Sequence, residues 1–341
     1  MVVAVADRSR PLALRAHAAS NLAAASTSRR ACAEAAAAAG AAAAATRLVA
    51  DATRAGDEGA ADAAAALVAA VSGDAGASGG RETIELREGL PPVIVVQASL
   101  ADGLGARLWA AAPALVSVLA GRRKLSSLPV PALANARVLE LGCGTAAVGL
   151  AAALLGAASV AATDGEAAAL QAARASAAAT LGEPDGADCW SWKRSVTLHT
   201  LAWGEAAGEE GGARSACAGP STPPCPACDD APPLAPGPFD VVLGADVLYD
   251  LAGAAALGRE VAARLAPTGV ALLACPVRDA ALLATFLASA DSAGLTVSLE
   301  RADWPLAGRA GVVGAGGAAG YEGGFQFARV TWRQDEGAWE P

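Results

Sequence analysis

The sequence has few aromatic side chains, no excess of positive charge and no long run of large apolar residues. Aromatic residues make up 4% of the 341 residues, and the formal net charge is −9. A nucleic-acid footprint needs clustered Lys and Arg, so the acidic balance gives it no support. The apolar runs are rich in Ala and are broken by Gly or by charged residues, so none of them resembles a membrane span. We therefore expect neither nucleic acid nor a membrane as a partner.

The cysteines do not suggest a disulfide framework. There are seven, they are scattered, and no secretory h-region precedes them. A reducing compartment is the simplest explanation, and we expect the cytoplasm. Cys225 and Cys228 form a C-x-x-C pair, but a zinc site needs four ligands and only Cys217 is close by. A redox pair would lie at a helix N-terminus, which this Pro-rich loop lacks, so we expect no metal and assign no function to the pair.

Residues 1–80 differ in composition from the rest of the chain. Positions 35–45 are Ala except for Gly40, and the first 33 residues hold five Arg but a single acid, Asp7. Such a segment resembles a transit peptide, which would direct the protein to a plastid or mitochondrion. The alternative is a low-complexity tail or a loose Ala-rich helical hairpin. We expect the structured domain at residues 82–335, with a disordered insertion at about 205–238 that is rich in Gly, Pro and Ser.

Apolar runs that alternate with helical segments predict a doubly wound α/β sheet. A helix is expected from about residue 109 to 119. Strands are expected at 83–87, 93–96, 138–141, 159–164, 196–203, 239–246 and 269–276, with a final antiparallel pair at 295–300 and 325–332.

The most informative segment is residues 138–165, which has the order strand, glycine turn, helix, strand, acid. Gly142 and Gly144 lack a Cβ, so the backbone can turn tightly and approach a ligand. An apolar helix at 148–155 would direct its N-terminus at that ligand. Asp164 ends the second strand, where a carboxylate can accept hydrogen bonds from two ribose hydroxyls. The pattern predicts a nucleotide-type pocket, and the alternative is an ordinary βαβ turn without a ligand.

Further motifs follow one another in a fixed order along the chain. They are Gly105-Ala-Arg-Leu-Trp109, Leu139-Glu140-Leu141-Gly142-Cys143-Gly144-Thr145, Thr163-Asp164-Gly165, Leu201-Ala202-Trp203-Gly204 and Asp246-Val247-Leu248-Tyr249. In this order they resemble the seven-β-strand (class I) methyltransferases that depend on S-adenosylmethionine (SAM), and more closely the methyltransferase-like protein-lysine N-methyltransferases. The resemblance covers roughly residues 82–333. An acid before the first glycine, here Glu140, is typical of SAM sites, where it lies near the methionine ammonium group.

The resemblance implies a Rossmann-like seven-stranded sheet with helices on both faces, preceded by the Ala-rich extension. It implies SAM as cofactor, a protein lysine as acceptor and a monomeric enzyme. The catalytic residues would be Asp246 and Tyr249. The residues implied in cofactor binding are Trp109, Glu140, Gly142, Cys143, Gly144, Asp164, Trp203 and Ala245.

Several of these residues have a structural alternative. Trp203 would stack on or border the adenine, or it is a core aromatic at a strand end. Asp246 would orient the lysine amine, or it is the N-cap of the following helix. Trp109 would form a wall of the methyl-transfer site, or it packs a helix.

Two positions depart from the family pattern. Ala146 replaces the third glycine of the turn, and Ala202 replaces the acid before Trp203. A small-molecule N-methyltransferase on the same fold is one alternative, since fold and cofactor do not fix the acceptor. A non-catalytic pseudo-methyltransferase that binds partners is another, which the two alanines would fit. A NAD-dependent oxidoreductase is a distant third, because Glu140 and the D-x-x-Y element have no place in it.

Overall fold

The computed structural model describes residues 1–28, individual residues between 32 and 67, and then residues 80–98, 105–184, 190–192, 196–203, 231–234, 237–276, 280–304 and 324–334. Cys217, Cys225 and Cys228 lie outside the described residues, as does most of the predicted insertion. The strands are β1 (Gly80–Ile84), β2 (Val93–Gln97), β3 (Arg137–Leu141), β4 (Ser159–Asp164), β5 (Ser191–Trp192), β6 (Val196–Thr200), β7 (Phe239–Ala245), β8 (Leu265–Pro276), β9 (Leu295–Ala302) and β10 (Phe325–Trp332). The helices are α1 (Val2–Ala6), α2 (Leu12–Ser28), α7 (Ala111–Leu119), α8 (Ala147–Leu154), α9 (Ala167–Leu181), α10 (Leu251–Arg264) and α11 (Ala280–Ser292).

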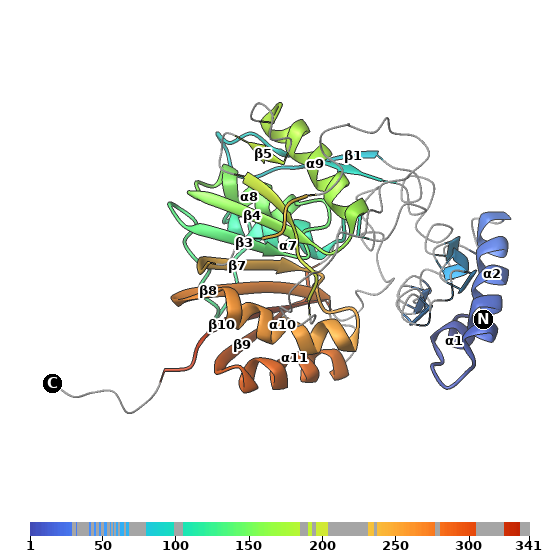
Figure 1. Ribbon diagram of the computed structural model, residues 1–341. Helices are drawn as coiled ribbons and strands as arrows, with labels where there is room; N and C mark the ends of the chain where they lie inside the picture. The colour runs from blue at the N-terminus through green and yellow to red at the C-terminus, as the bar shows by residue number, and fades with distance from the viewer. Residues whose placement is uncertain are drawn as a thin grey trace.

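An eight-stranded sheet forms the centre of the fold, in the order β5-β6-β4-β3-β7-β8-β10-β9 (Figure 1). Its inner strands pair in parallel, whereas β10 runs antiparallel to β8 and β9. From β3 the chain builds outward through β4 to β6, then returns to add β7 and β8 on the other side of β3. Ligands of open α/β sheets bind at such a reversal, outside the carboxyl ends of the strands. This sheet confirms the predicted doubly wound α/β fold, with β5 as a short additional edge strand.

Successive side chains of a strand point to opposite faces of the sheet, so one hydrophobic core forms on each face. In β3, Val138 faces one core and Leu139 the other. Helices α7, α8 and α9 cover the first face, where Leu115 and Leu150 are buried, and α10 and α11 cover the second, where Phe286 is buried. Strands buried on both faces are mainly apolar, as β3 and β7 are apart from Arg137, Glu140 and Asp240, and this pattern made them recognisable in the sequence.

The hairpin of β1 and β2 is held to the domain by a helix and does not join the main sheet. The N–H groups of Ile94 and Val96 in β2 donate to Thr180 Oγ1 at 2.9 Å and to Ser176 Oγ at 2.8 Å, both on α9. The edge of β2 that does not pair with β1 is therefore covered by hydroxyl groups of α9. This anchors the chain that leads into the Gly105–Trp109 segment.

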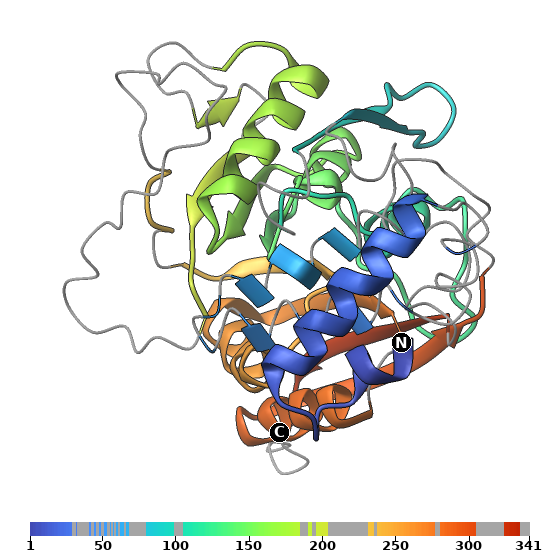
Figure 2. The same cartoon turned by 90° about the vertical axis from the view of Figure 1, so that its right-hand side faces the viewer.

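The N-terminal extension is helical in its described residues. Figures 1 and 2 show α1 and α2 beside the layered part of the fold. They pack around a separate small core that includes Val5, Leu22, Leu48 and Leu67, and Trp109 packs against this cluster. In the described part of this extension, α1 and α2 are helices, and the bounds of the extension stay a prediction. A role in targeting stays a prediction.

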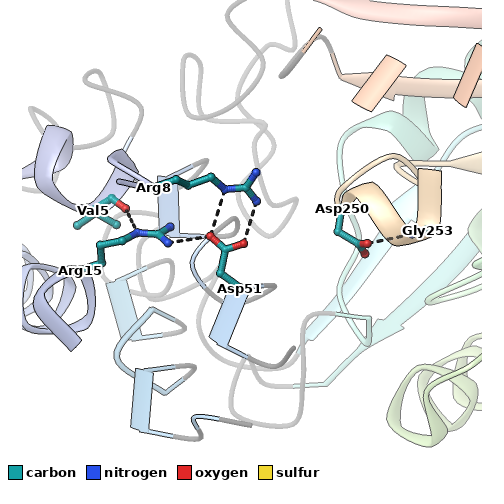
Figure 3. Close-up of polar contacts among 6 residues, drawn as sticks. All are labelled: Val5, Arg8, Arg15, Asp51, Asp250 and Gly253. Carbon is teal, nitrogen blue, oxygen red and sulfur yellow. Dashed lines mark hydrogen bonds and ion pairs between the residues drawn. The ribbon is translucent and has the colours of Figure 1, made fainter. Parts of the chain in front are cut away.

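A network of ion pairs and hydrogen bonds connects the N-terminal helices to Asp51 (Figure 3). Arg15 is only 3% exposed. Its Nη1 donates to Asp51 Oδ2 at 2.8 Å and its Nε to the Val5 carbonyl at 3.0 Å, while Arg8 Nη2 donates to the other oxygen of Asp51 at 2.9 Å. A buried guanidinium is tolerated when it is paired and hydrogen-bonded, so these contacts hold α2 to the helical residues around position 51.

Most predicted elements agree with the structure to within a few residues. The strand expected at 196–203 ends at Thr200, and the one expected from 269 begins at Leu265. Residues 231–234, which we assigned to the insertion, lie along β6, where the Thr200 N–H donates to the Pro232 carbonyl at 3.0 Å. None of the described helices has both the length and the apolar character needed to cross a membrane.

Candidate active site

The glycine turn after β3 is the point on which the site is built. Gly142 and Gly144 have φ values of +62° and +54°, in the left-handed region that favours glycine. A Cβ on Gly142 would lie 3.0 Å from Val247 Cγ1 and 3.3 Å from Trp203 Cη2. A Cβ on Gly144 would lie 2.8 Å from the Gly105 carbonyl oxygen. The turn therefore needs glycine for its backbone conformation and for the space around it.

These contacts show that motifs far apart in the sequence meet at one place. Gly105 begins the upstream segment, Trp203 follows β6 and Val247 belongs to the D-x-x-Y element after β7. Trp203 is half-buried and packs on the same core as α10, so it is a core aromatic on one side and borders Gly142 on the other. The core contact of Trp203 is therefore present, and its contact with adenine stays a prediction.

Trp109 is half-buried and packs against the N-terminal helical cluster. This contact was not foreseen, because the family motif gives no information about the residues before position 80. Cys143, inside the glycine turn, is buried, and burial raises the pKa of its thiol well above the usual value. Cys143 therefore fills space within the turn as a neutral thiol.

Ala146 stands at the N-cap of α8 with φ 58° and ψ 26°, and its side chain is completely buried. A non-glycine residue in this conformation is strained by the approach of its Cβ to the backbone. The third glycine of the family motif would adopt the same conformation without that cost. The departure noted in the sequence is therefore a point of backbone strain.

Glu140 is 2% exposed and lies beneath the first turn of α8. Its Oε2 accepts from the Gly149 N–H at 2.8 Å, and the Val148 N–H also supports the carboxyl. Burial outweighs these bonds and raises the pKa of Glu140 to about 8. A Cβ on Gly149 would lie 2.6 Å from Oε2, so Gly149 makes room for this carboxyl. In this structure Glu140 holds strand and helix together, and its contact with a methionine ammonium group stays a prediction.

Asp164 ends β4 and braces the glycine turn. Its Oδ2 accepts from the Gly144 N–H at 2.9 Å, and its Oδ1 accepts from the Glu166 N–H at 3.0 Å. Loss of surrounding solvent raises the pKa of Asp164 to about 6. The carboxylate is half-buried at the carboxyl edge of the sheet, where it could also accept from ribose hydroxyls.

Asp246 follows Ala245, the last residue of β7. Asp246 is 9% exposed, has φ 63°, and its N–H donates to the Ala274 carbonyl at 2.8 Å. The N-cap of α10 is a different residue, Asp250, whose Oδ1 accepts from the Gly253 N–H at 2.9 Å (Figure 3). The capping alternative proposed for Asp246 therefore does not apply.

Tyr249 is 45% exposed at the mouth of the site. Loss of solvent, and then the negative charges of Asp164, Asp250 and Glu166, raise the pKa of its hydroxyl above the usual range. Asp246 adds to the same effect. The hydroxyl thus stays protonated and can donate a hydrogen bond, and the surrounding carboxylates favour a cation.

Two residues near the turn were not singled out in the sequence. Glu166 follows Asp164 by two positions, and that spacing was the available clue. Arg107, in the middle of the Gly105–Trp109 segment, is 1% exposed and donates from Nη1 to the Ala98 carbonyl at 2.7 Å. Nothing in the sequence distinguishes this buried Arg from a surface one. Among the described residues, no group of His, Cys, Asp and Glu could hold a metal ion.

The bare glycine turn and the negative charge around it suit SAM. The glycine turn leaves bare backbone beside Asp164, and carboxylates surround the opening near Tyr249. The cofactor carries a positive sulfur and an ammonium group, which this environment stabilises. The strand order is that of the class I SAM-dependent methyltransferase fold, and SAM is the cofactor that this site fits.

Within that class, residues 91–215 match the family described as lysine methyltransferase. No curated protein sequence matches the chain. Among solved structures, the chain is similar to the ribosomal protein L11 methylase from Lactobacillus delbrueckii subsp. bulgaricus, with 15% identity and a TM-score of 0.36 over 61% of this chain and 73% of that one. It is also similar to an S-adenosylmethionine-dependent methyltransferase from Mesorhizobium loti, with 16% identity and a TM-score of 0.37 over 59% and 93% of the two chains. These distant likenesses do not bear on the acceptor.

Proposed function

We propose that the chain is a protein-lysine N-methyltransferase, which transfers a methyl group from SAM to a lysine side chain of a protein. The observation that supports this most is the contact between the D-x-x-Y element and the glycine turn, with Val247 Cγ1 3.0 Å from a Cβ built on Gly142. Asp246 and Tyr249, on either side of this contact, would then border the bound cofactor. The family match over residues 91–215 supports a lysine acceptor.

The residues around the turn would hold the cofactor. When bound, SAM supplies a methyl group on a positive sulfur, which becomes a neutral thioether as the methyl leaves. Gly142 and Gly144 would admit it, with Cys143 and Ala245 lining the same edge. Asp164 would hold the ribose and Trp203 would border the adenine. Glu140 would orient the amino acid end, where a positive ammonium group would favour the ionised form of its carboxyl.

The acceptor would be prepared by Asp246 and Tyr249. A lysine ammonium has a pKa of about 10.4 and must lose a proton before its nitrogen can attack. The Asp246 carboxylate would accept a hydrogen bond from the amine and direct its lone pair at the methyl, and the proton would pass to water. Tyr249 would close the site with its ring or its hydroxyl. Trp109 would form a wall, where a cationic group over indole gains about 0.5–2 kcal/mol.

Transfer of labelled methyl from SAM into a cell extract, followed by mass spectrometry of the labelled band, tests this proposal. We expect label on a protein lysine, and a loss of roughly 100-fold or more in rate with Asp246→Ala, the scale on which a misplaced reacting group slows a reaction. Asp240→Ala is the matched control. Asp240 lies near the opposite end of β7, where it pairs with Arg137 on the surface, so this variant should keep the wild-type rate.

The alternatives give different results. Label found only in small molecules would point to a small-molecule N-methyltransferase. Failure to bind SAM or its demethylated product in calorimetry would point to a non-catalytic, partner-binding protein. Wild-type activity in Asp246→Ala would contradict the role given to Asp246.

We further infer a monomeric enzyme of the cytoplasm, with the methyl-transfer domain at residues 82–335 and the helical extension before it. The scattered cysteines and the acidic balance support the location. Sedimentation of the purified chain and localisation of a carboxyl-terminal fluorescent fusion test the two inferences. Sedimentation as a dimer, or accumulation in plastids or mitochondria, would overturn them.

A further inference from the structure

Glu166 makes contacts that its place in the sequence does not explain. It occupies the N-cap position of α9, yet its side chain does not cap that helix. Its carboxylate instead accepts a hydrogen bond from the N–H of Gly105, about sixty positions earlier in the chain. A Cβ on Gly105 would lie only 2.7 Å from Glu166 Oε2, so a side chain at position 105 would displace this carboxylate.

This hydrogen bond completes a closed set of contacts around the cofactor turn. The Gly105 carbonyl lies against Gly144, 2.8 Å from where a Cβ would be. The Gly144 N–H donates to Asp164 at 2.9 Å, and the Glu166 N–H donates to the same carboxylate at 3.0 Å. The Glu166 carboxylate in turn accepts from the Gly105 N–H, which completes the set. The upstream segment, the glycine turn and the acid after β4 are thus joined in one ring.

Glu166 is also close to Asp164 and Tyr249. The residue is exposed, yet nearby protein removes enough solvent to raise the pKa of its carboxyl. Its charge acts on Tyr249 as well.

We propose that Glu166 is a positioning residue for the cofactor. Through the Gly105 N–H it fixes the Gly105–Trp109 segment against the glycine turn, so that Gly144 and Asp164 are held ready for the cofactor. The proposal rests on the SAM site and not on the identity of the acceptor. It predicts that affinity depends on the hydrogen bond at Gly105 more than on the charge of Glu166.

Calorimetry with S-adenosylhomocysteine and hydrogen exchange of the full-length protein test this. Glu166→Ala removes the acceptor, and loss of a hydrogen bond to a charged group should weaken binding by about tenfold or more. Glu166→Gln keeps an acceptor oxygen and should stay within about threefold of wild type. Amide exchange in residues 105–112 should accelerate about tenfold in Glu166→Ala and little in Glu166→Gln, while β9 is unchanged.

Glu300→Ala is the matched control, because Glu300 also accepts backbone N–H groups, from Ser126, Ser127 and Leu128, but outside the site. It should bind S-adenosylhomocysteine as wild type does. If Glu166→Ala does not fold, Gly105→Ala gives the same information, since its methyl would displace the Glu166 carboxylate.

Two results would overturn the proposal. One is unchanged affinity and unchanged exchange at 105–112 in Glu166→Ala. The other is a Glu166→Gln variant that binds as weakly as Glu166→Ala, because charge would then be what matters. Absence of lysine methylation would refute the proposed acceptor and leave this test intact. If the wild-type protein does not bind S-adenosylhomocysteine, the cofactor site on which the proposal rests is refuted.

Discussion

Replacement of Ala146 by glycine should cost little or no stability, although it deletes a completely buried methyl group. In a left-handed conformation a Cβ costs about 1–2 kcal/mol, and glycine relieves this. The lost methyl costs about 0.8 kcal/mol. The greater freedom of glycine in the unfolded chain costs about 0.4–1 kcal/mol. These contributions nearly cancel, so the free energy of unfolding should change by less than about 1 kcal/mol.

Ala151→Gly is the matched control, because Ala151 is also completely buried in α8 but lies inside the helix. It loses the same methyl, about 0.8 kcal/mol, and incurs the helix penalty of glycine, about 1 kcal/mol. It has no left-handed strain to relieve. We therefore expect about 2 kcal/mol of destabilisation, which separates it clearly from Ala146→Gly.

Urea unfolding followed by tryptophan fluorescence measures both variants, with equal m-values as the condition for comparison. Calorimetry with S-adenosylhomocysteine should show equal or tighter binding for Ala146→Gly, since the family glycine is restored at the turn. If Ala146→Gly and Ala151→Gly were equally destabilised, the argument from strain at position 146 would be refuted.

Three further predictions concern carboxylates outside the acceptor site. The folded pKa of Glu140, about 8, lies above its ordinary value of 4.5, so its contribution to stability is complete below 4.5 and is lost as the pH rises through 8. Urea midpoints of wild type should therefore fall between pH 5 and pH 9 by more than those of Glu140→Gln, and equal slopes would contradict this. Loss of solvent opposes ionisation of Glu300, but the N–H groups of Ser126 and Ser127 outweigh it and lower the pKa to about 2. Glu300→Ala should reduce the free energy of unfolding by about 1 kcal/mol at pH 7, the scale of an exposed charged contact, and wild type should lose this contribution only as the pH falls from 4.5 toward 2. Asp51→Ala removes the carboxylate that pairs with buried Arg15, so amide exchange in α2 should accelerate by about tenfold or more while β9 is unchanged. An α2 as protected as in wild type would show that the network does not hold the helix.

The central sheet was predictable because its strands carry their own pattern. β3 and β7 are followed by Gly142 and Asp246, and β4 ends at Asp164, and a parallel sheet brings such ends to one edge. The convergence of the motifs on the glycine turn followed from that topology. The ends of the elements were harder to predict. The sequence pattern of β6 continues to Trp203, although the paired strand ends at Thr200.

The contacts between segments could not be predicted in the same way. Glu140 was placed near the cofactor because of its position in a motif, whereas its nearest partners are the N–H groups of α8. Asp246 and Asp250 are both suitable N-caps, and only the three-dimensional path of the chain after β7 decides between them. The contact of Trp109 with the N-terminal helices joins segments whose sequences share no pattern.

The ring through Gly105, Gly144, Asp164 and Glu166 also has a consequence for folding. The site further requires Val247 and Tyr249, so the chain must bring together positions about 145 residues apart before the pocket exists. Contacts this distant form late, because loop-closure entropy must be overcome first. SAM would then bind only the finished fold, and at 100 times its dissociation constant it would add about 2.7 kcal/mol to stability. The supply of cofactor would therefore set how much of the newly made protein persists in the cell.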